Sequence, residues 1–382
     1  MLRAEERTLD SRLVPRGSCL TDPNIVPPSE GAQEGASTWQ LWYGDCISAP
    51  YPGATGCGKQ VLLYANSTDG ISWHKPSLGL YDVGAPYHKE TNAVLYGGGL
   101  GVLYDAHEPD ASKRYKGFGH ACWATGSCPL AEQLETTSGV ASASDADIAV
   151  SADGLVWTGV AAINWPDPQR YDCHNNLFWD GARSKYVAVT RDGFSGPIGR
   201  TIGIAASPTE AFGFDASTAP ISTLSGDEAR QLYSQITFPW RNTYLGIVMV
   251  FEAQSADGRV RCRLAWSNAA DSTEWRWVDE EGEDGGLGGA ELIPLGADGT
   301  FDSHVCFAAA SPFTHEAQEW LYYMGGNGPH SGERNSSLGC VPRPRAPHLS
   351  RRMLLCCLAA CAPATLTERC WEIETSPPRG QR

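Results

Sequence analysis

The chain has 382 residues, a formal net charge of −15 and a sequence pI near 5.0. Hydrophobic residues make up 42% and charged residues 19%, which excludes a disordered chain and an integral membrane protein. The acidic balance argues against nucleic acid as a partner, because phosphate binding needs a basic footprint. With 42 Gly, 25 Pro, 13 Trp and 14 Tyr, the composition indicates a β-rich protein with many tight turns, compatible with neutral polar ligands such as sugars.

The two ends of the chain differ in character from the rest. The first residues, MLRAEERTLDSRL, are charged and contain no apolar run, so we expect no secretory signal there. Residues 340–382 are basic and rich in Pro and Cys, and their apolar run at 353–362 is too short to span a bilayer. We therefore expect a partly irregular N-terminal segment at 1–37, one folded domain at 38–339, a disordered tail at 340–382 and no membrane partner. The sequence indicates no particular compartment.

Thirteen cysteines are spread over the chain, and none of them forms a Cys-x-x-Cys pair. The absence of that spacing argues against a zinc ribbon. Two pairs, Cys46 with Cys57 and Cys122 with Cys128, flank loops rich in Gly and Pro. Short-loop disulfides and free, partly buried thiols are both open for these cysteines.

A turn of the form Ser-x-Asp-Gly-x-x-Trp occurs at residues 67–73 and 151–157, and weaker relatives begin at Ser207 and Ser267. Each copy follows a short apolar stretch that is typical of a β-strand. In such a turn the Ser and Asp side chains can bond to the backbone, the Gly supplies a positive φ, and the Trp packs back over the strand. We therefore interpret these aspartates as structural and the repeat as a β-hairpin unit.

A second repeated element is a strand that carries a large aromatic residue. These anchors divide the chain into five units of roughly sixty to eighty residues, and they are Trp42, Tyr115, Tyr186, Tyr244 and Tyr322. Almost no window has the 3.6-residue period of a long amphipathic helix. Because a radial array of antiparallel sheets protects its edges by repetition, we predict an all-β fold, a five-bladed β-propeller of four-stranded blades whose last blade is incomplete.

Four segments resemble the signature of five-bladed propellers related to glycoside hydrolase families 32 and 43, in the branch described as glycosyl hydrolase family 32 N-terminal-like. They are residues 67–80, 105–118, 172–180 and the pair 301–305 with 320–323, within a match over about residues 38–338. The resemblance implies an axial pocket to which the innermost strand of each blade contributes side chains. It also implies carboxylates there, because glycoside cleavage needs one group to protonate the leaving oxygen and another to assist attack on the anomeric carbon. The Asn-Asp-Pro-Asn-Gly, Arg-Asp-Pro and Glu-Cys-Pro motifs of invertases are absent from this chain.

Three acidic residues are candidates for catalysis. Asp172 and Asp302 begin the predicted inner strands of the third and fifth units, where the resemblance implies a base, nucleophile or stabiliser. Glu90, at the entry to the second unit, is the candidate general acid by position. A turn-capping role for the two aspartates and a solvated loop position for the glutamate are the alternatives. We interpret Asp105 and Asp180, which follow aromatic strands, as hairpin aspartates.

Five further residues are candidates for substrate binding through hydrogen bonds or ring stacking: His174, Arg200, Tyr233, His304 and His330. Plain loop or core positions are the alternative for each of them. The histidines lack the His-x-His or His-x-x-x-His spacing of a metal site, so we expect no metal and no cofactor.

These observations predict a monomeric, glycoside hydrolase-like protein that acts on a carbohydrate in an axial pocket lined by carboxylates. A non-catalytic carbohydrate-binding or scaffolding propeller is the main alternative, since the invertase motifs are absent. A sialidase-like six-bladed propeller is a third reading. It needs an arginine cluster for the substrate carboxylate, and the count of five units argues against it.

Overall fold

The computed structural model describes residues 21–28, 38–46, 60–82, 89–96, 100–119, 148–161, 174–192, 199–214, 224, 226–278, 291–309, 311–315, 318–330 and 334–344. These residues form strands almost throughout, and the one helix among them is the single 3-10 turn η2 (Ala111–Lys113). The all-β prediction is therefore confirmed.

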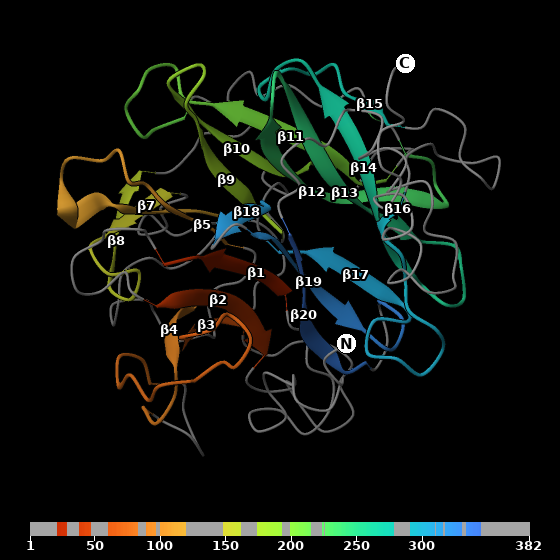
Figure 1. The fold of residues 1–382 in the computed structure, drawn as a ribbon, viewed down its shortest axis with the longest axis horizontal. Coiled ribbons are helices and arrows are strands. Elements are labelled where there is room, and N and C mark those ends of the chain that lie inside the picture. Colours follow the sequence, from red (N-terminus) through yellow and green to blue (C-terminus); the bar gives the residue numbers. More distant parts are fainter. Residues whose placement is uncertain are drawn as a thin grey trace, which may run out of the picture.

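The strands form four sheets, and strands that are neighbours in sequence are mostly neighbours in space (Figure 1). The first sheet has the order β1 (Thr21–Val26), β2 (Trp39–Cys46), β3 (Gln60–Ser67), β4 (Ala93–Tyr96). The second has the order β5 (Gly101–Tyr104), β6 (Tyr115–Phe118), β7 (Ile148–Ser151), β8 (Trp157–Ala161). The third has the order β11 (Thr201–Ala206), β10 (Lys185–Asp192), β9 (Asn176–Asp180).

The fourth sheet has nine strands and consists of two antiparallel groups. The first group is β12 (Arg230–Trp240), β13 (Thr243–Glu252), β14 (Val260–Ser267), β15 (Arg276–Trp277) and β16 (Glu291–Ile293). The second is β17 (Val305–Ala308), β18 (Phe313–His315), β19 (Gln318–Gly326) and β20 (Ser336–Pro344). One parallel pair, Val260 with Val305, joins the two groups, and a disulfide between Cys262 and Cys306 crosses the same seam. The two cysteine pairs considered from the sequence lie outside the side chains that the structure describes.

The first strands of the sheets follow one another around the molecule. Strand β1 lies against β5, β5 against β9, and β9 against β12, while β17 lies against β13, β14 and β1. The sheets therefore surround a common centre, as the different colours around the middle of Figure 1 show. This arrangement is consistent with the predicted β-propeller.

Two strands extend past the domain boundaries expected from the sequence. Strand β1 lies within the predicted N-terminal segment, and its Pro23 is compatible with pairing because β1 is the edge strand of its sheet. Strand β20 continues to Pro344, beyond residue 339, because it pairs with β19 along its whole length. The described fold therefore begins and ends outside the range 38–339.

The Ser-x-Asp-Gly turns have the hairpin geometry that the sequence predicts. In the first, Oγ of Ser67 accepts hydrogen bonds from the backbone N–H groups of Asp69 and Gly70, at 3.2 and 2.9 Å. Oδ1 of Asp69 accepts the next two backbone N–H groups at 2.8 and 2.7 Å. The second turn repeats all four bonds around Ser151 and Asp153. The structural interpretation of these aspartates is therefore confirmed.

The aromatic anchors connect each sheet to its neighbour. Three tyrosine hydroxyls donate to side chains of the preceding sheet, in the pairs Tyr115–Gln40 at 2.6 Å, Tyr186–Asp105 at 2.5 Å and Tyr244–Asp180 at 2.7 Å. The other two anchors donate to the glycine carbonyl of a Ser-x-Asp-Gly turn, in the pairs Trp42–Gly154 and Tyr322–Gly70, both at 2.7 Å. The last pair joins the last strands to the first sheet, so the sheets close into a ring.

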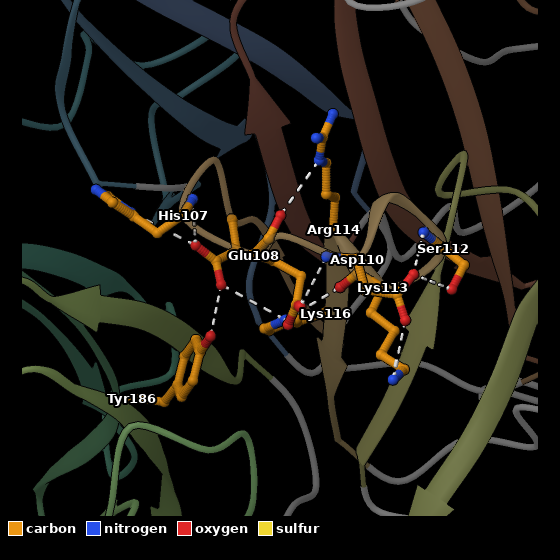
Figure 2. A network of polar contacts seen from close by, with 9 residues as sticks. His107, Glu108, Asp110, Ser112, Lys113, Arg114, Lys116 and Tyr186 are labelled. Carbon is orange, nitrogen blue, oxygen red and sulfur yellow. Dashed lines mark hydrogen bonds and ion pairs between the residues drawn. The ribbon is translucent and has the colours of Figure 1, made fainter.

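A buried polar network supports one of these connections (Figure 2). Lys116 is fully buried, and its Nζ lies 2.8 Å from Glu108, 3.5 Å from Asp105 and 3.0 Å from the carbonyl of Lys113. Burial alone would raise the pKa of Asp105, but hydrogen bonds from Tyr186 and the backbone, together with the Lys116 charge, hold it below its ordinary value. The network therefore stabilises the β5–β6 loop against the third sheet.

Candidate functional site

Eight residues from the third and fourth sheets and their loops form one cluster, which we call the arginine–aromatic cluster. Aromatic rings and guanidinium groups stack on one another, with two histidines among them. The members are His174, Arg191, Arg200, Tyr233, Phe251, Phe307, His330 and Arg334. The cluster thus joins segments that are up to 160 residues apart, from His174 to Arg334.

Tyr233 is the hub of the cluster, and a β-bulge positions it. In the pairing of β12 with β13, Leu232 lies opposite Val250 and Ser234 lies opposite Met249, so Tyr233 is the extra residue of the bulge. A bulge bends its strand and changes the direction of one side chain, and bulges are frequent beside functional sites. The Tyr233 ring contacts partners from several other elements of the fold.

His174 enters the cluster through an unusual backbone. Its φ of 57° lies in the left-handed region, which few residues other than Gly adopt. The side chain is buried and stacks face to face on Phe307, with ring centroids 4.2 Å apart. The carbonyl of His174 accepts a 2.5 Å hydrogen bond from Ser234, which holds the strained conformation against β12. Strain of this kind is concentrated at functional sites in proteins.

His330 lies after β19, between two aromatic rings of the cluster. Its ring centroid is 4.8 Å from that of Tyr233 and 4.6 Å from that of Phe251. The Arg334 guanidinium donates to the His330 carbonyl. Burial, together with the nearby charges of Arg334 and Arg200, lowers the pKa of His330 to about 3. His330 is therefore neutral at physiological pH.

This shift predicts a pH dependence. The folded pKa of His330 is below the ordinary value of 6.5, so the unfolded chain takes up the proton first as the pH falls. The stabilising contribution is complete above about pH 6.5 and is lost towards pH 3, by at most about 1.4 kcal/mol per pH unit. In NMR spectra of ¹³C-histidine-labelled protein, the resonance that disappears in His330→Asn is expected to titrate near pH 3. A midpoint near 6.5 would contradict the burial and charges described here.

Two arginines cover the Tyr233 ring. The guanidinium carbon of Arg191 lies 4.7 Å from the ring centroid, and that of Arg200 lies 5.4 Å from it and 5.3 Å from the Phe251 ring. Arg200 also donates to the side-chain oxygen of Gln231. Cation–aromatic stacking of this kind holds the guanidinium groups in a fixed orientation.

The structure brings together four of the five side chains predicted to bind substrate, namely His174, Arg200, Tyr233 and His330. His304, the fifth, makes a 2.9 Å contact between its Nδ1 and the Ser303 hydroxyl, beside the β17 end of the seam. Sequence reasoning missed four members of the cluster: Arg191, Phe251, Phe307 and Arg334. Arg191 had a signal, because it is a charged residue at the end of the apolar run Tyr-Val-Ala-Val-Thr in β10.

Asp302 belongs by its contacts to a turn. Its carboxylate accepts hydrogen bonds from Tyr323 and Thr300, each at 2.9 Å. A Cβ placed on Gly325 would come within 2.6 Å of the Asp302 Cβ, so Asp302 packs on the face of β19 that carries Gly325. Phe307, which pairs with the next residue along β19, points to the opposite face and into the cluster. The two sites thus lie on opposite faces of the β17–β19 pair.

The other two acidic candidates are placed differently. Glu90 is exposed and lies just before β4, the outer strand of the first sheet. Asp172 lies outside the described residues, two positions before His174 in the sequence. Strand β1 also contains Asp22, an acidic residue that sequence reasoning did not consider. The catalytic roles of Asp172, Asp302 and Glu90 therefore stay predictions.

Two features are absent from the residues that the structure describes. These residues contain no group of three or more His, Cys, Asp or Glu side chains that could hold a metal ion. Within the same part of the chain, no helix has the length and apolar character needed to cross a bilayer.

Comparison with known proteins shows what the fold resembles. No family model and no curated protein matches the chain. A solved glycoside hydrolase matches it at 13% identity and a TM-score of 0.50, covering 90% of this chain and 95% of that one. An N-acetylgalactosamine deacetylase from F. plautii, in complex with blood group B trisaccharide, matches at 12% identity and a TM-score of 0.52, covering 90% and 92%. The chain shares the fold of these proteins.

Enzymes of glycoside hydrolase families 43 and 32 are also among the matched structures. A family 43 β-1,3-galactosidase matches at 14% identity and a TM-score of 0.48, covering 85% of this chain and 90% of that one. The solved glycoside hydrolase with the TM-score of 0.50 confirms, as a likeness of fold, the resemblance to glycoside hydrolases predicted from the sequence. Fold alone does not determine the reaction, since one fold hosts many chemistries.

Proposed function

We propose that this protein is a five-bladed β-propeller that acts on a carbohydrate in an axial pocket, as a glycoside hydrolase. The blade count is supported by the seam between β14 and β17, where a single parallel pair divides the nine-stranded sheet into two antiparallel groups. With the other three sheets, these groups make five blades whose inner strands are β1, β5, β9, β12 and β17.

The observation that carries this proposal is the convergence of predicted binding residues on Tyr233. In carbohydrate sites, polar side chains that are held in place by neighbouring aromatic rings bind the hydroxyl groups of the sugar. Tyr233 and Phe251 are themselves buried, each 7% exposed, whereas Arg200 and His330 beside them are partly exposed, so a ligand would meet the cluster at these two side chains. A neutral His330 can both donate and accept a hydrogen bond, as sugar hydroxyls require.

Hydrolysis needs carboxylates beside this binding surface. We propose Asp172 as one of them, since it precedes His174 by two positions in the chain. Asp22 on β1 is a second, and Asp302 and Glu90 remain candidates from the sequence. One acid would protonate the leaving oxygen while another acts as the nucleophile or activates water.

Turnover of a carbohydrate panel tests the proposal. The panel contains aryl glycosides, fructans, arabinans and galactans, together with N-acetylgalactosamine glycosides assayed for acetate release. Release of reducing sugar supports glycoside hydrolysis. Release of acetate alone would replace it with deacetylation. Binding by calorimetry without turnover would favour the non-catalytic carbohydrate-binding protein, and neither binding nor turnover would reject both functions.

A further inference from the structure

We propose that the sugar bound at the arginine–aromatic cluster carries an oxyanion, either the carboxylate of an acidic sugar or a sulfate ester. This inference rests on the proposed carbohydrate function and names its substrate class. It follows from the charges that the fold concentrates around Tyr233.

Three guanidinium groups belong to this cluster. Arg191 is 1% exposed and Arg334 is 7% exposed, while Arg200 is less deeply buried. Arginine keeps its charge at any physiological pH, so the fold carries permanent positive charge into its interior. That position is unfavourable unless anionic groups offset it. In a chain with a net charge of −15, such a concentration of cations is opposite to the overall balance.

The geometry of arginine suits a ligand oxyanion. A guanidinium group presents five N–H donors in a planar fork that matches the two oxygens of a carboxylate or sulfate. The inference does not require these arginines to lack protein partners. Arg200 already donates one hydrogen bond to Gln231. The remaining N–H donors of a guanidinium group can bind a ligand while one of them holds a protein group.

Arg334 gives a second, independent observation. Its Nη1 donates to the carbonyls of Pro329 and His330, while its Nε is buried and has no hydrogen-bond partner among the described residues. A buried donor without a partner is unfavourable, and such groups are rare in folded proteins unless a ligand or water binds them. Arg334 therefore adds an N–H donor to the arginine–aromatic cluster that a ligand oxyanion could use.

Calorimetry with matched sugars tests the inference on the wild-type protein. The three probes are methyl galactoside, methyl galacturonide and methyl galactoside 6-sulfate, which share one ring. We expect the acidic sugars to bind at least about tenfold more tightly than the neutral one, since hydrogen bonds to charged groups are stronger than those to neutral groups. Their affinity should fall as salt increases, while that of the neutral sugar stays constant. Preference for galacturonide or for the sulfate identifies the oxyanion.

Variants of Arg200 locate the interaction. Arg200→Gln is expected to weaken binding of the preferred acidic sugar by about ten- to hundredfold and binding of methyl galactoside by clearly less, since the neutral sugar loses only hydrogen bonds. Arg200→Lys keeps the charge and loses the planar fork of donors. Its affinity for the acidic sugar is expected to lie between those of the wild type and Arg200→Gln. Arg276→Gln is the matched control, since Arg276 is exposed and stacks on Trp266 at 5.9 Å, away from the cluster.

The outcomes separate this inference from the proposed function. Binding or cleavage of neutral sugars with no preference for acidic ones would overturn the inference and leave the function intact. No binding of any sugar would overturn both. Equal losses in Arg200→Gln for acidic and neutral sugars would show a packing role and also overturn it. If circular dichroism shows that Arg200→Gln does not fold, the test is the salt dependence of acidic-sugar binding by the wild-type protein. Salt-independent binding would overturn the inference.

Discussion

Gly154→Ala is expected to lower the free energy of unfolding by about 2–4 kcal/mol. Gly154 has a φ of +73°, a conformation that disfavours Ala by about 1 kcal/mol. A Cβ there would overlap the Trp42 ring and lie 3.1 Å from the Tyr115 ring, and such overpacking typically costs a further 1–3 kcal/mol, roughly. The Gly154 carbonyl accepts hydrogen bonds from the indole N–H groups of Trp42 and Trp157, so any shift of the turn also disturbs these bonds.

Denaturant unfolding of matched glycine variants checks this expectation. Gly79→Ala is the control, because Gly79 has a φ of +68° and a Cβ added there would meet no atom within 4 Å, so this variant measures backbone strain alone. Gly70→Ala should resemble Gly154→Ala, since its Cβ would lie 2.6 Å from the Tyr322 hydroxyl. Equal losses for Gly79→Ala and Gly154→Ala would show that the neighbouring sheet does not pack on the turn.

Asp172→Asn is expected to lower kcat/KM for the preferred glycoside by about 10²- to 10⁴-fold, with little change in stability. Asn cannot exchange a proton or attack the anomeric carbon, and removal of positioned acid–base groups typically has effects of this size, about 10²–10⁴-fold. Asp22→Asn, measured beside it, reports whether β1 supplies the second carboxylate. Steady-state kinetics with an aryl glycoside is the measurement.

The matched control for these variants is Asp153→Asn. Asp153 accepts two backbone N–H groups through Oδ1, and Asn retains this oxygen, so turnover should be preserved. An Asp172→Asn enzyme with wild-type kcat/KM would remove Asp172 from the mechanism. The proposed hydrolysis would then depend on other acids.

Local turn chemistry made much of the fold predictable. The Ser67 and Ser151 turns encode their own hydrogen bonds within a few residues, so the pattern alone specifies the hairpin. The aromatic anchors were visible as a repeat, although their role as donors to the neighbouring sheet was not. Strand β1 escaped prediction because it is short and contains Pro23, which an edge strand tolerates.

The candidate site was only half predictable, for a physical reason. Tyr233 and His330 stand out in the sequence as polar aromatic residues in strand and loop positions. Their assembly depends on a one-residue bulge and on stacking with Phe307 from β17 and with Arg191 from the third sheet. Such long-range pairing leaves no local pattern, and the opposite-face position of Asp302 likewise follows from register alone.

The central claim is that sheets arranged in a ring bring distant residues together into one sugar-binding site at Tyr233. A crystal structure of the complex with the tightest-binding sugar from the panel tests it most directly. We expect the sugar at the partly exposed side of the arginine–aromatic cluster, with Arg200 and His330 bound to its polar groups. A sugar held elsewhere, on the outer strands or against the exposed Glu90, would contradict it.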